Sequence, residues 1–259
     1  MIYITGDTHA DFRRFKTTAF PEQKEMTKED YVIILGDFGG IWSTDPQNRE
    51  ENYWLDWLEE KNFTTLFIDG NHENFDRLDA LPVREWNGGK VHEIRPSILH
   101  LMRGQIFRID GKSFFTFGGA RSYDIRDGVF EPGDPRLFHI QKMRAKGDPA
   151  YLNLLYRINR VSWWPQEMPA KTQMQEGTMN LQKAGWNVDY VLTHCLPSSL
   201  HRSVSGGLFK TNELTDYLEY VREMCAYRAW FCGHYHWDRD LNEREKVVYE
   251  RILRVEKRP

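Results

Sequence analysis

Five short motifs combine glycine or threonine with aspartate, asparagine or histidine. In chain order they are Gly6-Asp7-Thr8-His9, Gly36-Asp37, Gly70-Asn71-His72, Thr193-His194 and Gly233-His234-Tyr235-His236. Carboxylate, amide and imidazole groups together favour Mn²⁺, Fe, Zn²⁺ or Ni²⁺ over an all-oxygen calcium site or a thiolate zinc site. The motifs therefore predict a transition-metal centre.

The number and spacing of these side chains bear on how many ions they hold. The candidate ligands are Asp7, His9, Asp37, Asn71, His194, His234 and His236. This set is too large for one tetrahedral ion and suits two ions about 3.5–4 Å apart that share a carboxylate. Asp7 and His9 are two residues apart, as are His234 and His236, and such pairs project to the same side of an extended backbone. We therefore expect each pair to bind one ion. A preceding glycine leaves room at the bend and permits positive φ.

The order D-x-H, G-D, G-N-H, H and G-H-x-H resembles that of the calcineurin-like metallophosphoesterase superfamily, and the motifs span most of the chain, from Asp7 to His236. The resemblance implies an α/β fold, a four-layer sandwich of two mixed β-sheets flanked by helices. It also implies two ion sites that share Asp37. The ligands would be Asp7, His9, Asp37 and His236 for one ion, and Asp37, Asn71, His194 and His234 for the other.

The activity that the resemblance implies is hydrolysis of phosphomonoesters or phosphodiesters. Two divalent ions, with manganese the preferred candidate, would prepare a hydroxide for attack on phosphorus. Asp37 would act in catalysis as the shared ligand, and Asn71 would also contact substrate. His72 matches the family histidine that faces the leaving group, and its imidazolium would protonate the departing oxygen.

The second motif departs from the protein serine/threonine phosphatase branch. That branch reads G-D-x-x-D-R-G, in which the second Asp orients the histidine and the Arg binds phosphate. Here the stretch is Gly36-Asp37-Phe38-Gly39-Gly40-Ile41. Another carboxylate must then orient His72, and Asp69 is near in sequence. Arg121, in a glycine-rich turn, is the leading candidate to bind phosphate, although a solvated arginine explains it equally well; Arg202 is a weaker candidate.

Hydrophobic periodicity predicts the elements that must position these motifs. In the first third, strands are expected at 2–5, 31–35 and 64–68 and helices at 11–20 and 52–61, an order typical of parallel α/β units. The middle predicts strands at 91–103, 105–109 and 113–117, with a hairpin turn at Asp110-Gly111. The last third predicts strands at 188–193, 229–232 and 247–255 and a helix at 212–225. Ligand sites in open α/β sheets lie beyond the carboxyl ends of the strands, where these motifs fall.

The segment at about 123–179 carries five prolines and few strand signals, and it is interpreted as an inserted or cap-like stretch of turns and short helices. No linker or internal repeat divides the chain, so a single domain over 1–259 is expected. The longest aliphatic run, Tyr31 to Leu35, is far shorter than the ~20 residues of a membrane span. A strand pattern at residues 2–4 argues against a signal peptide.

The amino-acid composition limits the expected cellular compartment and the class of substrate. The three cysteines predict reduced thiols in a cytoplasmic protein. The net charge of −3 argues against nucleic acid as substrate and for a small phosphoester, with a nucleotide as one candidate. A nuclease of the same superfamily, or a non-catalytic scaffold on this fold, is the alternative. Oligomeric state is left open.

Other chemically suggestive residues have structural explanations. For His92, His100, His139 and His201 a structural role is expected. Cys195 follows His194, but adjacent side chains in a strand point apart, so an inert packed thiol is favoured. Trp42 and Trp237 each follow a metal motif and either line a pocket or pack in the core.

Overall fold

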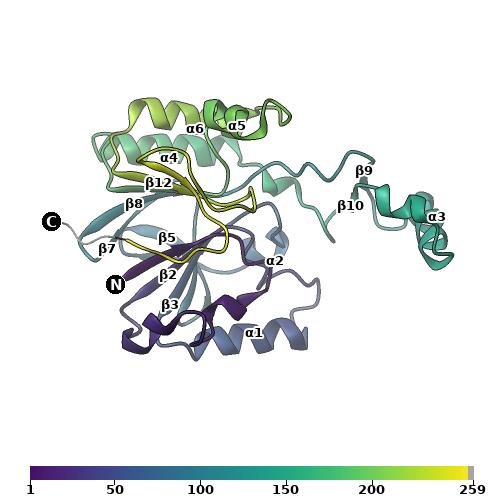
Figure 1. The fold of residues 1–259 in the computed structure, drawn as a ribbon, viewed down its shortest axis with the longest axis horizontal. Coiled ribbons are helices and arrows are strands. Elements are labelled where there is room, and N and C mark those ends of the chain that lie inside the picture. Colours follow the sequence, from purple (N-terminus) through teal and green to yellow (C-terminus); the bar gives the residue numbers. More distant parts are fainter. Residues whose placement is uncertain (256–259) are drawn as a thin grey trace.

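Two mixed β-sheets lie face to face between layers of helices in the computed structural model, which describes residues 1–255 (Figure 1). The last four residues of the predicted single domain lie outside this range. The first sheet has the order β15-β1-β2-β3-β6-β5-β4, and the second has the order β13-β14-β12-β11-β8-β7. The prediction of two mixed sheets flanked by helices is confirmed.

The strands are short and mostly follow the apolar runs of the sequence. Those of the first sheet are β1 (Ile2–Thr5), β2 (Tyr31–Leu35), β3 (Thr64–Ile68), β4 (Val83–Trp86), β5 (Gly89–Arg95), β6 (Ile98–Leu101) and β15 (Leu253–Arg254). Those of the second sheet are β7 (Gln105–Ile109), β8 (Lys112–Phe117), β11 (Tyr190–Thr193), β12 (Ala229–Cys232), β13 (Arg239–Asp240) and β14 (Glu245–Val247).

Helices cover the outer face of each sheet. The α-helices are α1 (Arg49–Glu59), α2 (Phe75–Asp79), α3 (Pro135–Ala145), α4 (Lys171–Lys183), α5 (Ser198–Ser205) and α6 (Glu213–Met224). The short 3₁₀ helices are η1 (Phe12–Phe15), η2 (Pro21–Glu25), η3 (Pro149–Asn153) and η4 (Pro165–Glu167). Figure 1 shows α1 below the first sheet and α4 to α6 above the second. None of the helices within residues 1–255 has the length and apolar character needed to cross a lipid bilayer.

Alternate residues of the central strands face two separate cores. In β2, Ile33 and Leu35 pack between the two sheets, whereas Val32 and Ile34 pack into the core that includes Leu55 and Leu58 of α1. A continuous apolar run is what a strand buried on both faces requires. The run also lies between parallel neighbours, β1 and β3. These layers align the carboxyl ends of the strands that precede the metal motifs.

Three predicted elements are wrong in detail. The strand predicted at 91–103 is two antiparallel strands, β5 and β6, and the strand predicted at 247–255 is two short strands, β14 and β15, in different sheets. The helix predicted at 11–20 is only the one-turn η1. By contrast, the β7–β8 hairpin has both Asp110 and Gly111 in the left-handed region, as its turn type requires.

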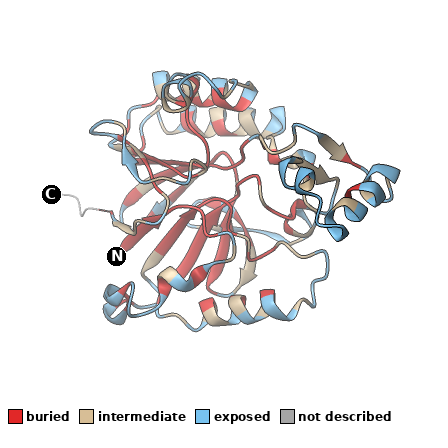
Figure 2. Ribbon diagram, turned by 45° about the vertical axis from the view of Figure 1, so that its right-hand side comes forward, coloured by how far each residue is buried: buried red, intermediate tan, exposed pale blue. Residues whose placement is uncertain are grey.

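The segment interpreted as an insertion has two parts. Residues 124–160, here called the arm, include the parallel pair β9 (Gly128–Phe130) and β10 (Tyr156–Ile158) together with α3 and η3. The arm projects from the sandwich (Figure 1) and is largely exposed (Figure 2). Its buried Phe130 and Ile140 belong to none of the clusters that form the cores of the sandwich. The following α4 is different, because its Leu181 packs in the core beneath α6.

Candidate active site and metal centre

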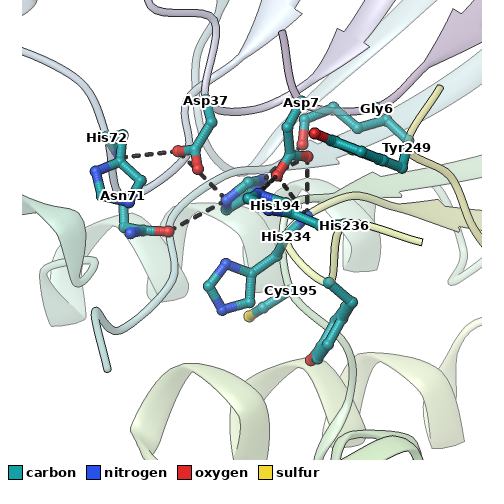
Figure 3. A network of polar contacts seen from close by, with 12 residues as sticks. Gly6, Asp7, Asp37, Asn71, His72, His194, Cys195, His234, His236 and Tyr249 are labelled. Atoms are coloured by element: carbon teal, nitrogen blue, oxygen red, sulfur yellow. Dashed lines mark hydrogen bonds and ion pairs between the residues drawn. The ribbon is translucent and has the colours of Figure 1, made fainter. Parts of the chain in front are cut away.

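The seven predicted ligands come from the carboxyl ends of strands in both sheets. Asp7, Asp37 and Asn71 follow β1, β2 and β3 of the first sheet. His194 follows β11 and His234 follows β12 of the second. Figure 3 shows six of the seven converging on one region: Asp7, Asp37, Asn71, His194, His234 and His236. The sheets must therefore be docked for the site to form.

The backbone at the motifs is not extended. His9, Asp37, His234 and His236 have φ values of 44°, 45°, 70° and 51°. The expectation that paired ligands converge through strand alternation is therefore wrong, because left-handed turns bring them together. Such conformations cost about 1–3 kcal/mol each in a non-glycine residue and persist where the surrounding structure fixes them, commonly at functional sites.

The first ligand group is Asp7, His9, Asp37 and His236. Each offers one donor atom, and these atoms all lie within 4.8 Å of one another. Nε2 of His236 is 3.1 Å from Oδ2 of Asp7, and Nε2 of His9 is 3.7 Å from Oδ2 of Asp37. These four are the residues predicted for one ion. Their carboxylate and imidazole donors fit a divalent transition metal.

The second predicted group, Asp37, Asn71, His194 and His234, adjoins the first. Nε2 of His194 lies 3.4 Å from Oδ1 of Asp37 and 3.3 Å from Oδ1 of Asn71. The rings of His194 and His234 have centroids 5.0 Å apart. Asp37 thus directs one oxygen toward His9 and the other toward His194, so it lies between the two groups.

Backbone and side-chain groups outside the ligand set orient its members. Nδ1 of His194 lies 2.7 Å from the Leu35 carbonyl oxygen, which directs Nε2 toward Asp37. Nδ2 of Asn71 donates to Oγ of Ser122, which in turn donates to Glu167, so the amide oxygen of Asn71 faces His194. Ser122 and Glu167 were missed by the sequence reasoning, since neither lies in a motif.

Charge is concentrated at this centre. Burial opposes ionisation of Asp37, but His194, His72 and His9 outweigh it and hold the carboxyl pKa well below its usual range. Burial disfavours the charged form of His194, yet Asp37 and Asp7 raise its pKa to about 10. Burial lowers the pKa of His234 to about 3, which keeps its ring in the neutral form that binds metal. A field that attracts a proton to His194 also attracts divalent cations.

Two glycines leave only enough room for the neighbouring ligands. A Cβ on Gly36 would lie 2.2 Å from Nδ1 of His194, and one on Gly70 would lie 2.0 Å from Oδ1 of Asp37. Gly36 also has φ +98°, which other residues rarely adopt. Both glycines therefore allow a predicted ligand to approach the backbone closely. Gly36 also supplies the positive φ that its bend requires.

His72 lies at the edge of the centre, where it lines a cavity of about 470 Å³. Its backbone N–H donates to Oδ1 of Asp37 at 2.8 Å, and its ring is near those of His9 and Trp42. Burial lowers the pKa of His72, and Asp37 opposes this effect. The residues that line the cavity are His9, Ala10, Gly39, Trp42, His72, Arg157 and His236.

Neither Asp69 nor Arg121 is among the described residues that line the cavity at His72. The Asp69 carboxylate accepts hydrogen bonds from His100 and Arg103 in a separate buried cluster. Arg121 is exposed and is not among the described residues that line the cavity. Arg202, on α5, donates to the Ser198 carbonyl oxygen. Arg157, which does line the cavity, was missed because it lies in the arm, outside any recognisable motif.

The other histidines, cysteine and tryptophans considered from the sequence lie outside the predicted ligand groups. His92 and His100 stack on each other, and His201 lies between the hydroxyl groups of Tyr123 and Tyr235. His139 is exposed on α3. Burial raises the pKa of Cys195 to about 12, so the thiol stays protonated, as expected for a packed cysteine. Trp42 lines the cavity, whereas Trp237 packs beside a small core cluster.

Two mixed sheets with carboxylate, amide and imidazole groups gathered at their strand ends define the class of metal-dependent phosphoesterases. The family model "Calcineurin-like phosphoesterase" matches residues 1–238, which include all five motifs. The chain belongs to this family, whose members are phosphoesterases that use divalent metals.

Curated relatives of the chain include lariat debranching enzymes. It is 26% identical to lariat debranching enzyme A of Xenopus laevis over 143 residues, which are 50% of this chain and 26% of that protein. It is 23% identical to the enzyme of Danio rerio over 161 residues, 55% of this chain and 27% of that protein. It is 25% identical to the human enzyme over 143 residues, 50% of this chain and 25% of that protein. The matched region thus spans about a quarter of the length of these relatives.

Proposed function

We propose that this phosphoesterase hydrolyses a small phosphomonoester or phosphodiester by using two divalent transition-metal ions. The observation that carries the proposal is the position of Asp37. Its two oxygens face different imidazole groups, as a carboxylate shared by two ions would require. Manganese is the first ion to test, and iron, zinc and nickel suit the same donors.

The ligand residues would divide into two groups around Asp37. Asp7, His9 and His236 would complete the first ion site, and Asn71, His194 and His234 the second. Such a pair of ions supplies a hydroxide nucleophile near neutral pH and offsets negative charge on the phosphoryl oxygens. Within the chain, the hydrogen bonds that Leu35 and Ser122 accept support ligand orientation, because they direct Nε2 of His194 and Oδ1 of Asn71 inward.

His72 would act on the leaving group. Its ring lines the cavity beside the first ligand group, and its backbone N–H is held by Asp37. In the proposed reaction, the hydroxide oxygen forms a bond to phosphorus, the bond from phosphorus to the departing oxygen breaks, and the protonated His72 imidazole gives that oxygen a proton. Asn71 and Arg121 remain proposed substrate contacts. Asn71 lies within the centre, whereas Arg121 is exposed and is not among the described residues that line the cavity.

The test combines elemental analysis with a substrate panel. We expect two equivalents of transition metal per chain and manganese-stimulated hydrolysis of an aryl phosphate or a bis-aryl phosphate. A chelator should abolish turnover, and added Mn²⁺ should restore it. Failure of the metal-loaded protein on phosphomonoesters, cyclic nucleotides and diesters would contradict the proposal. Protein that binds no metal would instead support a non-catalytic scaffold.

Lariat substrates, which give the curated relatives their name, form the second candidate class. The family match supports a small phosphoester and a nucleic acid equally, so the panel includes a lariat and a linear nucleic acid. A salt-sensitive affinity for either polymer would favour a nuclease over the small-molecule proposal. A cytoplasmic location is part of the proposal and is supported by three cysteines that are free and buried.

A further inference from the structure

An arginine from the arm lines the cavity at the metal centre. Arg157 lies in β10 and is the one arginine or lysine among the described residues that line this cavity. The same cavity is lined by His72, His9 and His236. The positive charge of Arg157 therefore faces the space that a phosphoryl group would occupy in the proposed function.

The Arg157 guanidinium is fixed by one ion pair, which engages only some of its N–H donors. Its Nη2 forms an ion pair with Oδ2 of Asp124, and the two side chains are 25% and 37% exposed. Within residues 1–255, no other polar atom accepts a hydrogen bond from this guanidinium. A guanidinium has five N–H donors, so several remain for a ligand. The other oxygen of Asp124, Oδ1, is buried without a hydrogen-bond partner in the described chain.

Arg160, at the end of the arm, and Trp164, just after it, both contact one residue close to His72. Arg160 forms an ion pair with Oδ1 of Asp76, and Nε1 of Trp164 donates to Oδ2 of the same carboxylate at 2.9 Å. Asp76 lies in α2, a few residues after His72, and Trp164 is fully buried against Trp42. The chain that leaves β10 is thus fixed to the wall of the cavity, and this limits where Arg157 can move.

We propose that Arg157 binds the phosphoryl oxygens of the substrate and that Asp124 is the positioning residue that holds the guanidinium toward the cavity. A planar guanidinium presents two parallel N–H groups to two phosphate oxygens, a geometry that lysine cannot reproduce. This inference rests on the proposed function, because it assigns a phosphate contact to the same site. It places that contact in the arm, whereas the glycine-rich turn at Arg121 was the candidate from sequence.

The test compares Arg157→Ala with the matched control Arg126→Ala. Arg126 is another arginine of the arm, but it is exposed and contacts Asn153 and Asp127. The probes are inorganic phosphate as a competitive inhibitor and the best substrate of the panel. For Arg157→Ala we expect roughly a 10- to 100-fold rise in the phosphate inhibition constant, a similar fall in kcat/KM, and unchanged metal content. Arg126→Ala should resemble the wild type.

Two further variants separate binding from folding. Arg157→Lys keeps the charge without the fork and should recover only part of the phosphate affinity. Asp124→Asn should weaken phosphate binding by a smaller factor while circular dichroism and metal content stay unchanged. If Arg157→Ala matches Arg126→Ala in active, metal-loaded protein, the inference is overturned and the proposed function stands. If the wild type hydrolyses nothing and does not bind phosphate, the proposed function fails and the inference fails with it.

Discussion

The proposed ligand residues are packed so closely that a neighbouring glycine leaves no space for a side chain. The Cβ position of Gly70 lies 2.0 Å from Oδ1 and 2.4 Å from the backbone nitrogen of Asp37. Because both contacts are to one ligand, a methyl group at residue 70 must displace it. Overpacking of this kind typically costs about 1–3 kcal/mol. The residue that the methyl group would displace is Asp37, which we propose is shared by two ions.

We therefore expect Gly70→Ala to lower metal affinity by at least about tenfold, comparable to the loss of a residue that orients a ligand. The measurement is metal content after dialysis against a weak chelator. Gly111→Ala is the control, because that glycine has positive φ but no atom within 4 Å of its Cβ position. Equal metal retention in both variants would show that Asp37 tolerates the displacement.

His72 is predicted to serve turnover and not metal binding. The contact between His72 and Asp37 is made by the backbone N–H, which His72→Ala retains. We expect this variant to bind metal as the wild type does and to lose about 10²–10⁴-fold in kcat, the range for removal of a general acid. A substrate whose leaving group needs no proton should lose much less. A variant that no longer binds metal would show that this role is wrong.

At the scale of elements, a buried charge cluster joins the two sheets beside the centre. Asp69 follows β3 and Arg103 follows β6 of the first sheet, and Gly118, after β8 of the second sheet, lies directly against Asp69. Burial opposes ionisation of Asp69, but Arg103 and His100 outweigh it and hold the carboxyl pKa far below its usual range. The pair therefore contributes stability above the unfolded carboxyl pKa of about 3.9, and this is lost as pH falls toward the folded pKa.

Arg103→Met should accordingly destabilise the fold by about 3–5 kcal/mol at about pH 7, since it leaves a buried carboxylate without its partner. The difference in free energy of unfolding between this variant and the wild type should shrink at about pH 3. At that pH the wild type begins to lose the contribution of Asp69. Urea unfolding at both pH values measures this. Arg108→Met on β7 is the exposed control. An equal difference in free energy of unfolding at both pH values would contradict the proposed contribution of the Asp69–Arg103 pair.

Strands that are buried on both faces are predictable from the sequence, whereas very short strands are not. The runs at Tyr31–Leu35, Thr64–Ile68 and Ala229–Cys232 match β2, β3 and β12, because strands buried on both faces need continuous apolar residues. The two-residue β15 pairs with β1 and carries too few residues for any periodicity to be detected. The ligands were recognisable as motifs, but their left-handed turns were not. Arg157 and Asp124 approach the site through tertiary packing, which spacing along the chain does not encode.

At the scale of the whole molecule, the arm divides into a base and a tip. The base contains β9, β10 and the contacts of Arg160 and Trp164 with Asp76. The tip contains α3 and η3, with Phe138 and Leu152 exposed at 72% and 78%. Neither residue packs against the clusters that form the cores of the sandwich. The tip is therefore expected to add little to the stability of the fold.

Replacing residues 134–154 by about 12 glycine and serine residues, enough for a parallel crossover, should retain β9, β10 and Arg157. We expect the Tm to change by no more than about 3 °C, with metal content and kcat/KM for a small aryl phosphate unchanged. Differential scanning calorimetry and steady-state kinetics provide the measurements. A large fall in kcat/KM for the small substrate would show that the tip holds Arg157 in place.

The centre draws ligands from motifs near both ends of its 238-residue match, with Asp7 first and His236 last. During translation the segment with Asp7, His9, Asp37 and Asn71 leaves the ribosome long before His194 and the histidines after β12. A nascent chain thus presents these four side chains without His194, His234 and His236. The proposed two-ion centre is complete only once synthesis has passed His236, so we expect both ions to be bound after the ribosome has made nearly all of the sandwich.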